Sequence, residues 1–546
     1  MTLTLEYSSL FLLLLVSLLF LFLFRRKTAA RNRRLPPGPP GWPIFGNLFQ
    51  LGDMPHRTLA DLRAKHGPVV WLQIGAMKTM VILSADAASV FFKHHDHAFA
   101  DRTITETMRA HNYNKSSLAL APYGPYWRLM RRLVTVDMLV AKRINETASV
   151  RRKCVNDMIT WLSKEAGKLE EGDGVYVARF VFLMSFNLFG NLMLSRDLFD
   201  PESETGSEFF SAMAGLLEWT GHANVADMFP WLKWLDPQGL RKKMDRDMGK
   251  ALEIASKFVK QRLEEQRRDK ETRDFLDVLI DFQSSNTEEA LTISDKDLNI
   301  FILVQTIQCQ KFDSSSFCFD KKSLIKSVFY TCVQEIFMAG SETTSSIIEW
   351  AMTELLRNRE CLEKVKSELD GVVGNGREIE ESDIDNLPYL QAVVKETLRL
   401  HPPIPLLVPR KAIKETQFMG YDIPKDTQVL VNAWAIGRDP SFWDQPLDFK
   451  PQRFVDCNNI DYKGHHFGFI PFGAGRRMCA GVPLAHRILH LVLGSLLHRF
   501  HWELQTHVTP STVDMKEKLG ITMRKLQPLL LVPKFIPSSS SIVNTE

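Results

Sequence analysis

The sequence lacks the features that mark several large classes of protein. Its 546 residues include only seven cysteines, an odd number scattered along the chain, which argues against a disulfide framework. The net charge is only +4, so overall basicity gives no indication of nucleic-acid binding. There is no internal repeat and no alternation of strands and helices of the kind that builds parallel sheets. The composition is that of an ordinary globular protein, 45% hydrophobic and 24% charged.

Charge is also absent from a long stretch near the N-terminus, YSSLFLLLLVSLLFLFLF at 7–24, which RRKTAARNRR follows directly. About 18 apolar residues just cross a ~30 Å hydrocarbon core, whereas the apolar core of a cleaved signal peptide usually has ~7–15. We therefore expect a transmembrane anchor at 1–24 in preference to a cleaved signal. The basic cluster then stays in the cytosol, and the rest of the chain lies on the cytosolic surface.

The remainder of the chain divides into a linker, one large body and a short tail. LPPGPPGWPIFGN completes a basic and proline-rich linker at 25–47, because proline favours extended backbone. In the body, 48–535, GPVVWLQIGAMKTMVIL predicts a hairpin that turns at Gly75, and helical periodicity dominates 85–400. TQFMGYDIP and TQVLVNAWAIG then predict short strands. We expect a single catalytic domain, mainly α with small β-sheets, and a flexible tail at 536–546.

The most informative motif is PFGAGRRMCAG, which surrounds Cys479. Its glycines permit tight turns and close approach of the backbone, and its two arginines favour a thiolate. The apolar helix predicted for VPLAHRILHLVLGSLLHRF places Cys479 just before a helix N-terminus, which also favours an anion. The motif alone is also compatible with a buried structural cysteine in a turn.

Three further motifs carry polar side chains at helical spacing. AGSETT lies within an apolar helix, where Glu342 and Thr343 could relay protons, or where the hydroxyl could bond back into the helix. KETLRL places Glu396 and Arg399 on one face of a helix, as a buried structural pair or an ordinary surface pair. FKPQRF offers Arg453 as a third member of that network.

In PYWRLMRRL, Trp127 and Arg131 are four residues apart, so that an indole N–H and a guanidinium point the same way. They could bind a pair of carboxylates or form a surface cation–π contact.

Together these motifs resemble the cytochrome P450 haem–thiolate monooxygenases over nearly the whole chain. The resemblance implies the mainly helical cytochrome P450 fold and a haem b cofactor whose iron is bound by the Cys479 thiolate, a ligand that favours O–O cleavage. It also implies that Thr343 and Glu342 deliver protons, that Phe472 and Gly473 belong to the haem-binding loop, and that Glu396, Arg399 and Arg453 form a structural ion network. The haem propionates would be bound by Trp127, Arg131, Arg410 and Arg477.

The same resemblance implies a microsomal enzyme that inserts one oxygen atom from O2 into an apolar small molecule. Electrons would come from NADPH through the membrane-bound cytochrome P450 reductase, and the location would be the endoplasmic reticulum membrane, single-pass, with the catalytic domain facing the cytosol. FADRT, SLALAPYGPYWR and GITMRK are similar to plant enzymes of the geraniol hydroxylase and iridoid oxidase group, which implies a monoterpenoid substrate. Alkaloids and phenylpropanoids are the alternative substrates.

The chain departs from this family at two places. PQRF has Gln452 where the family usually has Glu, although the arginine that completes the network is kept. The larger departure is the segment 304–334, without which DLNIFIL would run directly into EIFMAGSETT as one amphipathic helix. We interpret it as a retained intron translated in frame, or else as a genuine surface insertion. In either case we expect a helical break between Ile302 and Lys322, with the helix restarting near Lys322 and continuing past Trp350. If the segment spoils this helix, the chain would be a catalytically impaired haem protein.

Overall fold

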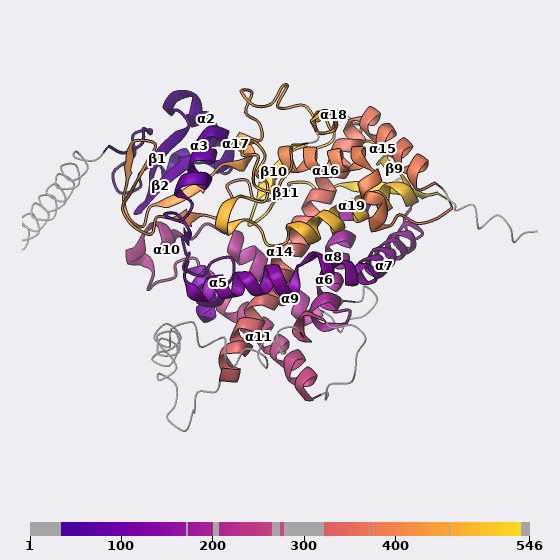
Figure 1. Cartoon of the computed structure of the whole chain (residues 1–546), viewed down its shortest axis with the longest axis horizontal. Coiled ribbons are helices and arrows are strands. Elements are labelled where there is room, and N and C mark those ends of the chain that lie inside the picture. Colours follow the sequence, from indigo (N-terminus) through magenta and orange to yellow (C-terminus); the bar gives the residue numbers. More distant parts are fainter. Residues whose placement is uncertain are drawn as a thin grey trace, which may run out of the picture.

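The computed structural model describes residues 34–170, 173–199, 207–264, 274–277, 321–374, 376–457 and 459–536 (Figure 1). The expected anchor at 1–24, the basic part of the linker, the helical break expected before Lys322 and the tail from 537 lie outside these residues. Elements carry the labels used in Figure 1.

Helices make up most of the described chain, as expected. The helices before the long segment outside the described residues are α2 (Pro55–His66), α3 (Ala85–Val90), α4 (Tyr113–Ser116), α5 (Pro125–Arg132), α6 (Ala141–Glu146), α7 (Ala148–Ala166), α8 (Val177–Leu194), α9 (Ser207–Gly221), α10 (Val225–Met228) and α11 (Leu240–Glu264). Those after it are α14 (Lys321–Arg357), α15 (Arg359–Val372), α16 (Pro388–Leu400), α17 (Ala433–Ile436), α18 (Gln452–Asp456) and α19 (Val482–Arg499). Shorter 3-10 and π turns join them, among them η3 (Thr107–Asn112), η6 (Pro230–Leu232) and η9 (Gly475–Arg477).

The strands form small sheets that pack against the helices, among them β11 against α14. The largest has the order β1-β2-β8-β5-β3, in which β2 and β8 are parallel and the other neighbours antiparallel. Its strands are β1 (Val69–Ile74), β2 (Met77–Ile82), β3 (Asp101–Arg102), β5 (Arg410–Lys411) and β8 (Gln428–Val431). The smaller sheets comprise β4 (Val175–Tyr176) with β12 (Leu530–Phe535) and β9 (Phe500–Leu504), β10 (Glu517–Leu519) with β11 (Met523–Lys525), and β6 (Thr416–Phe418) with β7 (Tyr421–Ile423).

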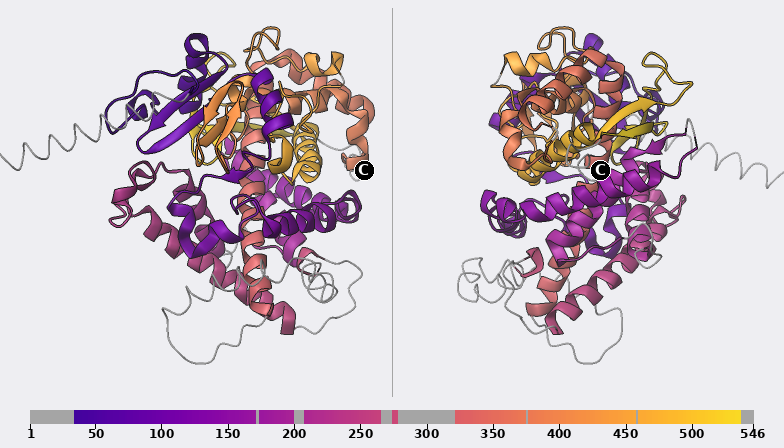
Figure 2. Two further views of the ribbon diagram at one scale, coloured as in Figure 1. Left: turned by 60° about the vertical axis from the view of Figure 1, so that its left-hand side comes forward. Right: turned by 90° about the vertical axis from the view of Figure 1, so that its right-hand side faces the viewer.

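Helix α14 passes through the middle of the molecule, where α8, α16 and α19 pack around it (Figures 1 and 2). From Ser341 to Leu356 nearly all of its side chains are buried, because they face other helices on every side. Within the described residues it runs without interruption from Lys321 to Arg357. This confirms the prediction that the helix continues past Trp350, whereas the predicted restart near Lys322 depends on residues before 321, which lie outside the described part of the chain.

Two local expectations differ from the structure. TQVLVNAWAIG, predicted as a strand, is a strand only to Val431, because the Asn432 side chain accepts the Ala435 N–H and caps the short helix α17. Residues 37–47, assigned to the linker, lie against β1. There Trp71 N–H donates to Pro37 O and Asn47 N–H to Gln73 O, so this part of the linker belongs to the folded body.

Among the described residues, one helix is long and apolar enough to cross a membrane, α8. In the fold 83% of it is buried, and its phenylalanines pack against α14 and α9. Its apolar composition is therefore explained by its position in the core.

Candidate active site

The loop that carries Cys479 is tightly folded before α19. Gly473 and Gly475 have positive φ angles of 71° and 68°, and a Cβ on Gly475 would lie 2.5 Å from an oxygen of Asp96. Only glycine meets both requirements without strain. Cys479 N–H donates to Phe472 O at 3.0 Å, which closes the loop, and α19 begins three residues later at Val482. The sequence prediction of a cysteine just before a helix N-terminus is confirmed.

Cys479 has solvent-accessible surface although its thiol lies inside the protein, surrounded by other residues. Burial raises its pKa above the ordinary value, while the N–H groups of Gly481 and Val482 and the charge of Arg131 act in the opposite direction. A side chain can have both properties when it faces space inside the protein instead of bulk water. The amide donors and the nearby cation are the groups that stabilise a thiolate.

Arginines gather around this loop in excess of carboxylates. Asp96 is shared by Arg410 and Arg476, and Arg410 also donates to Ala474 O. Arg102 donates to Ala119 O and Val408 O, and Arg131 to Met478 O.

Arg477, the second arginine of the motif, donates to the carbonyls of Ala100, Leu118 and Ala121. Burial, with the charges of Arg410 and Arg131, lowers its pKa to about 10, and burial likewise lowers the pKa of Arg102. These guanidinium groups bond mainly to backbone carbonyls and, among the described residues, the one carboxylate in contact with them, Asp96, is shared, so the protein neutralises their charge only partly.

The structure brings together the residues that the resemblance assigns to the propionates. Trp127 and Arg131 lie on α5, Arg410 on β5 and Arg477 in η9. The Trp127 indole donates to Leu118 O at 2.8 Å, and the guanidinium above its ring, at 4.2 Å, is that of Arg477. The surface cation–π alternative is wrong, because Trp127 is buried.

One face of α14 forms an accessible stripe within the otherwise buried helix. Ala339 is exposed, and Glu335, Gly340 and Thr343 are partly exposed. Because positions i, i+4 and i+8 share a helix face, Glu335, Ala339 and Thr343 point the same way. The small side chain of Ala339 leaves room beside this face, whereas Gly340 packs against the Phe189 ring of α8.

Glu342 and Thr343 have different surroundings although they are adjacent in sequence. The Thr343 hydroxyl donates to Ala339 O at 2.5 Å, which is the back-bonding that the sequence left open as the alternative. Glu342 is buried against β11, where its carboxylate accepts from Thr522 at 3.3 Å and lies 3.4 Å from the Arg524 guanidinium. Burial raises the pKa of Glu342, and Arg524 opposes the shift.

The predicted ion network is present behind the site. Arg399 and Glu396 are completely buried and joined by two hydrogen bonds of 2.7 Å, and Arg453 lies 3.1 Å from Glu396. Arg399 also donates to Gly437 O and Pro446 O. Gln452, in place of the usual Glu, bonds to Asp456 on the surface, so the substitution leaves the network intact.

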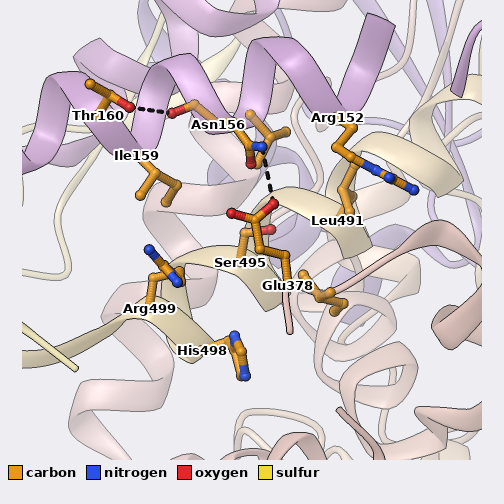
Figure 3. Close-up of a pocket in the computed structure, with 11 residues that line it drawn as sticks. Arg152, Asn156, Ile159, Thr160, Glu378, Leu491, Ser495, His498 and Arg499 are labelled. Carbon is orange, nitrogen blue, oxygen red and sulfur yellow. Dashed lines mark hydrogen bonds between the residues drawn. The ribbon is translucent and has the colours of Figure 1, made fainter. Parts of the chain in front are cut away.

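A separate cleft of about 270 Å³ lies between α7 and α19 (Figure 3). In it Asn156 bonds to Glu378 at 3.0 Å, beside His498 and Arg499. Neither Cys479 nor Thr343 lines this cleft. We therefore assign the chemistry to the surroundings of Cys479.

Sequence reasoning missed Asp96 and Arg102, which complete the cluster around the cysteine loop. Arg102 stands in FADRT and Asp96 in KHHDH, but their partners lie far along the chain. Arg102 bonds to backbone carbonyls, which leave no trace in a sequence pattern. No side-chain signal could have revealed that contact.

The residues present fit a haem. The accessible thiol with its amide donors suits an iron ligand, and the incompletely neutralised arginines suit two propionates. The accessible stripe of α14 offers small side chains beside which a flat macrocycle and a substrate can lie.

Comparison with known proteins agrees with this geometry. The family model described as Cytochrome P450 matches residues 36–310 and 316–532, so the match is interrupted within the segment 304–334. The chain is 52% identical over 515 residues to cytochrome P450 76A2 of Solanum melongena, covering 94% of this chain and 96% of that protein.

Two relatives have names that describe an activity. The chain is 48% identical over 522 residues to an iridoid oxidase of Catharanthus roseus, covering 95% of both proteins. It is 40% identical over 503 residues to a geraniol 8-hydroxylase of Catharanthus roseus, covering 92% of this chain and 94% of that one.

Among solved structures, a zebra fish cytochrome P450 with progesterone superposes with a TM-score of 0.70 at 25% identity. The superposition covers 88% of this chain and 99% of the zebra fish protein. The matched family model spans nearly the whole chain, and the relatives above 30% identity extend over more than nine tenths of it. The chain therefore belongs to the cytochrome P450 family and is a cytochrome P450 monooxygenase.

Proposed function

We propose that this monooxygenase inserts one oxygen atom from O2 into a terpenoid of the monoterpenoid or iridoid type. The assignment of the active site rests on one observation: the accessible Cys479 thiol lies beside arginines whose charge is incompletely neutralised. The substrate class rests on the iridoid oxidase and geraniol 8-hydroxylase relatives. The pocket segments we propose mix apolar and small residues, which is consistent with an apolar ligand: 104–118, 206–227, 338–343, 404–408 and 521–523.

Cys479 would ligate the haem iron, and Phe472 and Gly473 would shape the loop beneath the ring. Arg131, Arg410 and Arg477 would compensate the propionate charges, and Trp127, whose single N–H donates to Leu118 O, would lie beside the propionates. The bound haem supplies O2 activation and transfer of one oxygen atom to a C–H bond. The protein holds the thiolate, orients the substrate and excludes water from the site.

Protons would reach the site along α14. Arg524 is half-exposed and lies 3.4 Å from Glu342, so the carboxyl of Glu342 has a route to solvent. The Thr343 hydroxyl, on the accessible stripe, would hold a proton beside the reacting oxygen by turning away from Ala339 O. A carboxyl whose pKa is raised by burial is suited to donating protons near neutral pH.

Electrons would come from NADPH through the cytochrome P450 reductase. Arg128 and Arg132 on α5 and Lys142 on α6 are exposed. Together with Arg143 they would form a basic face for an acidic partner, although Lys142 and Arg143 also lie 4.0 and 3.6 Å from Glu146.

The enzyme would lie on the cytosolic side of the endoplasmic reticulum membrane, held by a single span at 1–24. An aromatic patch on the folded body supports this location. Phe45 contacts Phe49 and Phe229, which in turn contacts Trp231. The patch consists of the exposed residues Trp42, Ile44, Phe45, Phe49, Trp231, Trp234 and Leu235.

A catalytically impaired haem protein is the second candidate, because of the segment 304–334. The continuity of α14 favours activity. Within the described residues the helix is unbroken from Lys321 and keeps Ala339 and Thr343 on one accessible face.

The test is to express the chain with and without 304–334 and record the reduced carbon-monoxide spectrum of each. Each form is then supplied with reductase, NADPH, ¹⁸O2 and a panel of geraniol, an iridoid, an alkaloid and a phenylpropanoid. We expect the thiolate spectrum from both forms and one ¹⁸O atom in a terpenoid product.

A Cys479→Ser variant serves as the matched control, and it should lose the thiolate spectrum. Products from the alkaloid or phenylpropanoid alone would refute the terpenoid proposal. A spectrum that appears only after removal of 304–334 would favour the impaired protein. Coupled or rearranged products without ¹⁸O would identify a different reaction at the same haem.

A further inference from the structure

A half-buried carboxylate on α14 holds a short piece of backbone beside the site. Glu335 accepts the N–H groups of Leu118 at 2.7 Å and Ala119 at 3.0 Å. It also accepts the hydroxyls of Ser117 and, at 3.2 Å, Tyr113. The carboxylate therefore holds the start of the segment 117–121 against α14.

The same segment is held from its other side through its carbonyl groups. Leu118 O accepts the Trp127 indole at 2.8 Å and Arg477 at 3.4 Å, and Ala121 O accepts Arg477 at 2.6 Å. Ala119 O accepts Arg102 at 2.9 Å. The segment 117–121 thus joins α14 to the loop of Cys479, with its N–H groups on an anion and its carbonyls on cations.

Glu335 also lies on the face of α14 that we propose to border the substrate site. It shares the accessible stripe of α14 with Ala339 and Thr343, one and two helical turns further along. Leu118, whose N–H it accepts, is partly exposed, as is Leu120. A shift of the segment would therefore change the space in front of the stripe.

We propose that Glu335 is a positioning residue that sets the place of the segment 117–121 and, through it, the size of ligand that the site accepts. The effect on ligand size rests on the proposed function. The hydrogen bonds by which Glu335 holds the segment 117–121 do not depend on that function. Glu335 acts on the reaction through the segment, and through Arg477 and Trp127 that bond to it.

A carboxylate suits this position better than an amide of the same shape. The N–H groups of Leu118 and Ala119 can only donate, and they meet the two different oxygens of Glu335. In a Glu335→Gln variant one oxygen becomes an NH2 group, so one N–H must face another donor. Glu335→Asp keeps both acceptor oxygens on a shorter side chain, so it should still hold the segment 117–121 in part.

The test compares amide hydrogen exchange in the full chain and its variants. For Glu335→Gln we expect the amides of 117–121 to exchange on the order of tenfold faster, since a hydrogen bond to a charged group is lost. The matched control is Glu368→Gln. Glu368 is also half-buried and accepts two backbone amides, those of Tyr389 and Leu390, at 2.7 and 2.9 Å. This control should speed exchange at 389–390 and leave 117–121 unchanged.

A second measurement separates positioning from general stability. The haem-loaded proteins are titrated spectroscopically with imidazole and with the bulkier 4-phenylimidazole. Glu335→Gln should shift the ratio of the two dissociation constants, Glu335→Asp should partly restore it, and Glu368→Gln should leave it at the wild-type value.

Unchanged exchange at 117–121, or equal acceleration throughout the chain, would overturn the inference. Faster exchange with an unchanged ligand ratio would also overturn it, since Glu335 would then be an anchor without influence on the site. Failure of the proposed function is recognised separately, by a missing thiolate spectrum or terpenoid product in the wild-type chain.

Discussion

Gly340 marks the closest approach of α14 to α8. A Cβ built on this glycine would lie 2.1 Å from the Phe189 ring, which is itself packed against Phe337. The motif AGSETT therefore needs glycine here for helix packing, in addition to any contact with a ligand. The same residue type has a different effect where its surroundings are open, as at Gly371 near the end of α15.

These two glycines give a matched prediction. We expect Gly340→Ala to lower the free energy of unfolding by about 1–3 kcal/mol, because the ring or the helices must move. Gly371→Ala, with nothing within 4 Å of its new methyl group, should raise it by about 0.4–1 kcal/mol. Urea unfolding of both variants measures the difference. Equal effects would show that α14 and α8 adapt freely.

The ion pair of Arg399 and Glu396 gives a second residue-scale prediction. Arg399→Met leaves a completely buried carboxylate with one partner fewer, which we expect to cost about 3–5 kcal/mol of unfolding free energy. Lys153→Met is the control, because Lys153 and its partner Asp197 are about half exposed. Loss of this surface ion pair should lower the free energy of unfolding by less than about 1 kcal/mol. A cost for Arg399→Met as small as the control's would contradict a structural role for the network.

At the scale of elements, the sequence predicts best those features that side-chain patterns determine. The helix through AGSETT was predicted to run past Trp350, and it is helical without interruption from Lys321 to Arg357. The hairpin at Gly75 was also correct, since that glycine has a φ of 57° between β1 and β2. The strand predicted for the second half of TQVLVNAWAIG was wrong. The Asn432 side chain caps a short helix there, and this cap outweighs the alternating pattern that favours a strand.

Contacts made by backbone groups could not be predicted in the same way. Cys479 and the pair Glu396–Arg399 were identifiable because their partners stand in the same motif or at fixed helical spacing. The segment 117–121 has no such signature, since its carbonyls bind arginines far away in sequence. The identity of the residues 117–121 matters less for these bonds than the path of their backbone.

The junction of β10 with α2 gives a prediction on pH. Glu517 of β10 is buried between His56 and Arg57 of α2. Burial alone would raise its pKa, but these hydrogen bonds outweigh burial and lower the pKa from 4.5 to about 2. A carboxyl whose pKa is lowered by folding stabilises the fold at every pH above its ordinary pKa. That stabilisation is lost as the pH falls from 4.5 towards 2.

We therefore expect wild type to be more stable than Glu517→Gln above pH 4.5, with the difference shrinking as the solution is acidified. Unfolding free energies of both proteins between pH 7 and pH 3 measure this. A difference that stays constant over the whole range would mean that folding leaves the pKa of Glu517 unchanged, which would contradict the prediction.

At the scale of the whole molecule, the aromatic patch joins two distant parts of the chain. Gly75 N–H donates to Phe45 O, and Ala76 N–H donates to Met228 O, so the β1–β2 turn holds both parts together. Trp234 is 81% exposed and Trp231 57%, which is unusual for tryptophan in contact with water. Aromatic rings of this kind are favoured at the interface between lipid and water.

Membrane contact at this patch can be measured with the full chain in nanodiscs of brominated lipid. We expect bromine to quench part of the tryptophan fluorescence, and Trp231→Phe with Trp234→Phe to remove the share that comes from these two of the three exposed patch tryptophans, Trp42 being the third. Trp502→Phe is the control, because Trp502 is buried in β9. Equal quenching in wild type and the double variant would place the patch away from the lipid.

The segment 117–121 also has a thermodynamic consequence. Its N–H groups are bound to α14 and its carbonyls to residues around the Cys479 loop, so ordering one side favours order on the other. Coupling of this kind is reciprocal: whatever the haem adds to substrate affinity, the substrate adds to haem affinity. A tightly bound substrate should therefore slow the transfer of haem to an excess of apomyoglobin. The enzyme would then retain its cofactor longest where its substrate is abundant.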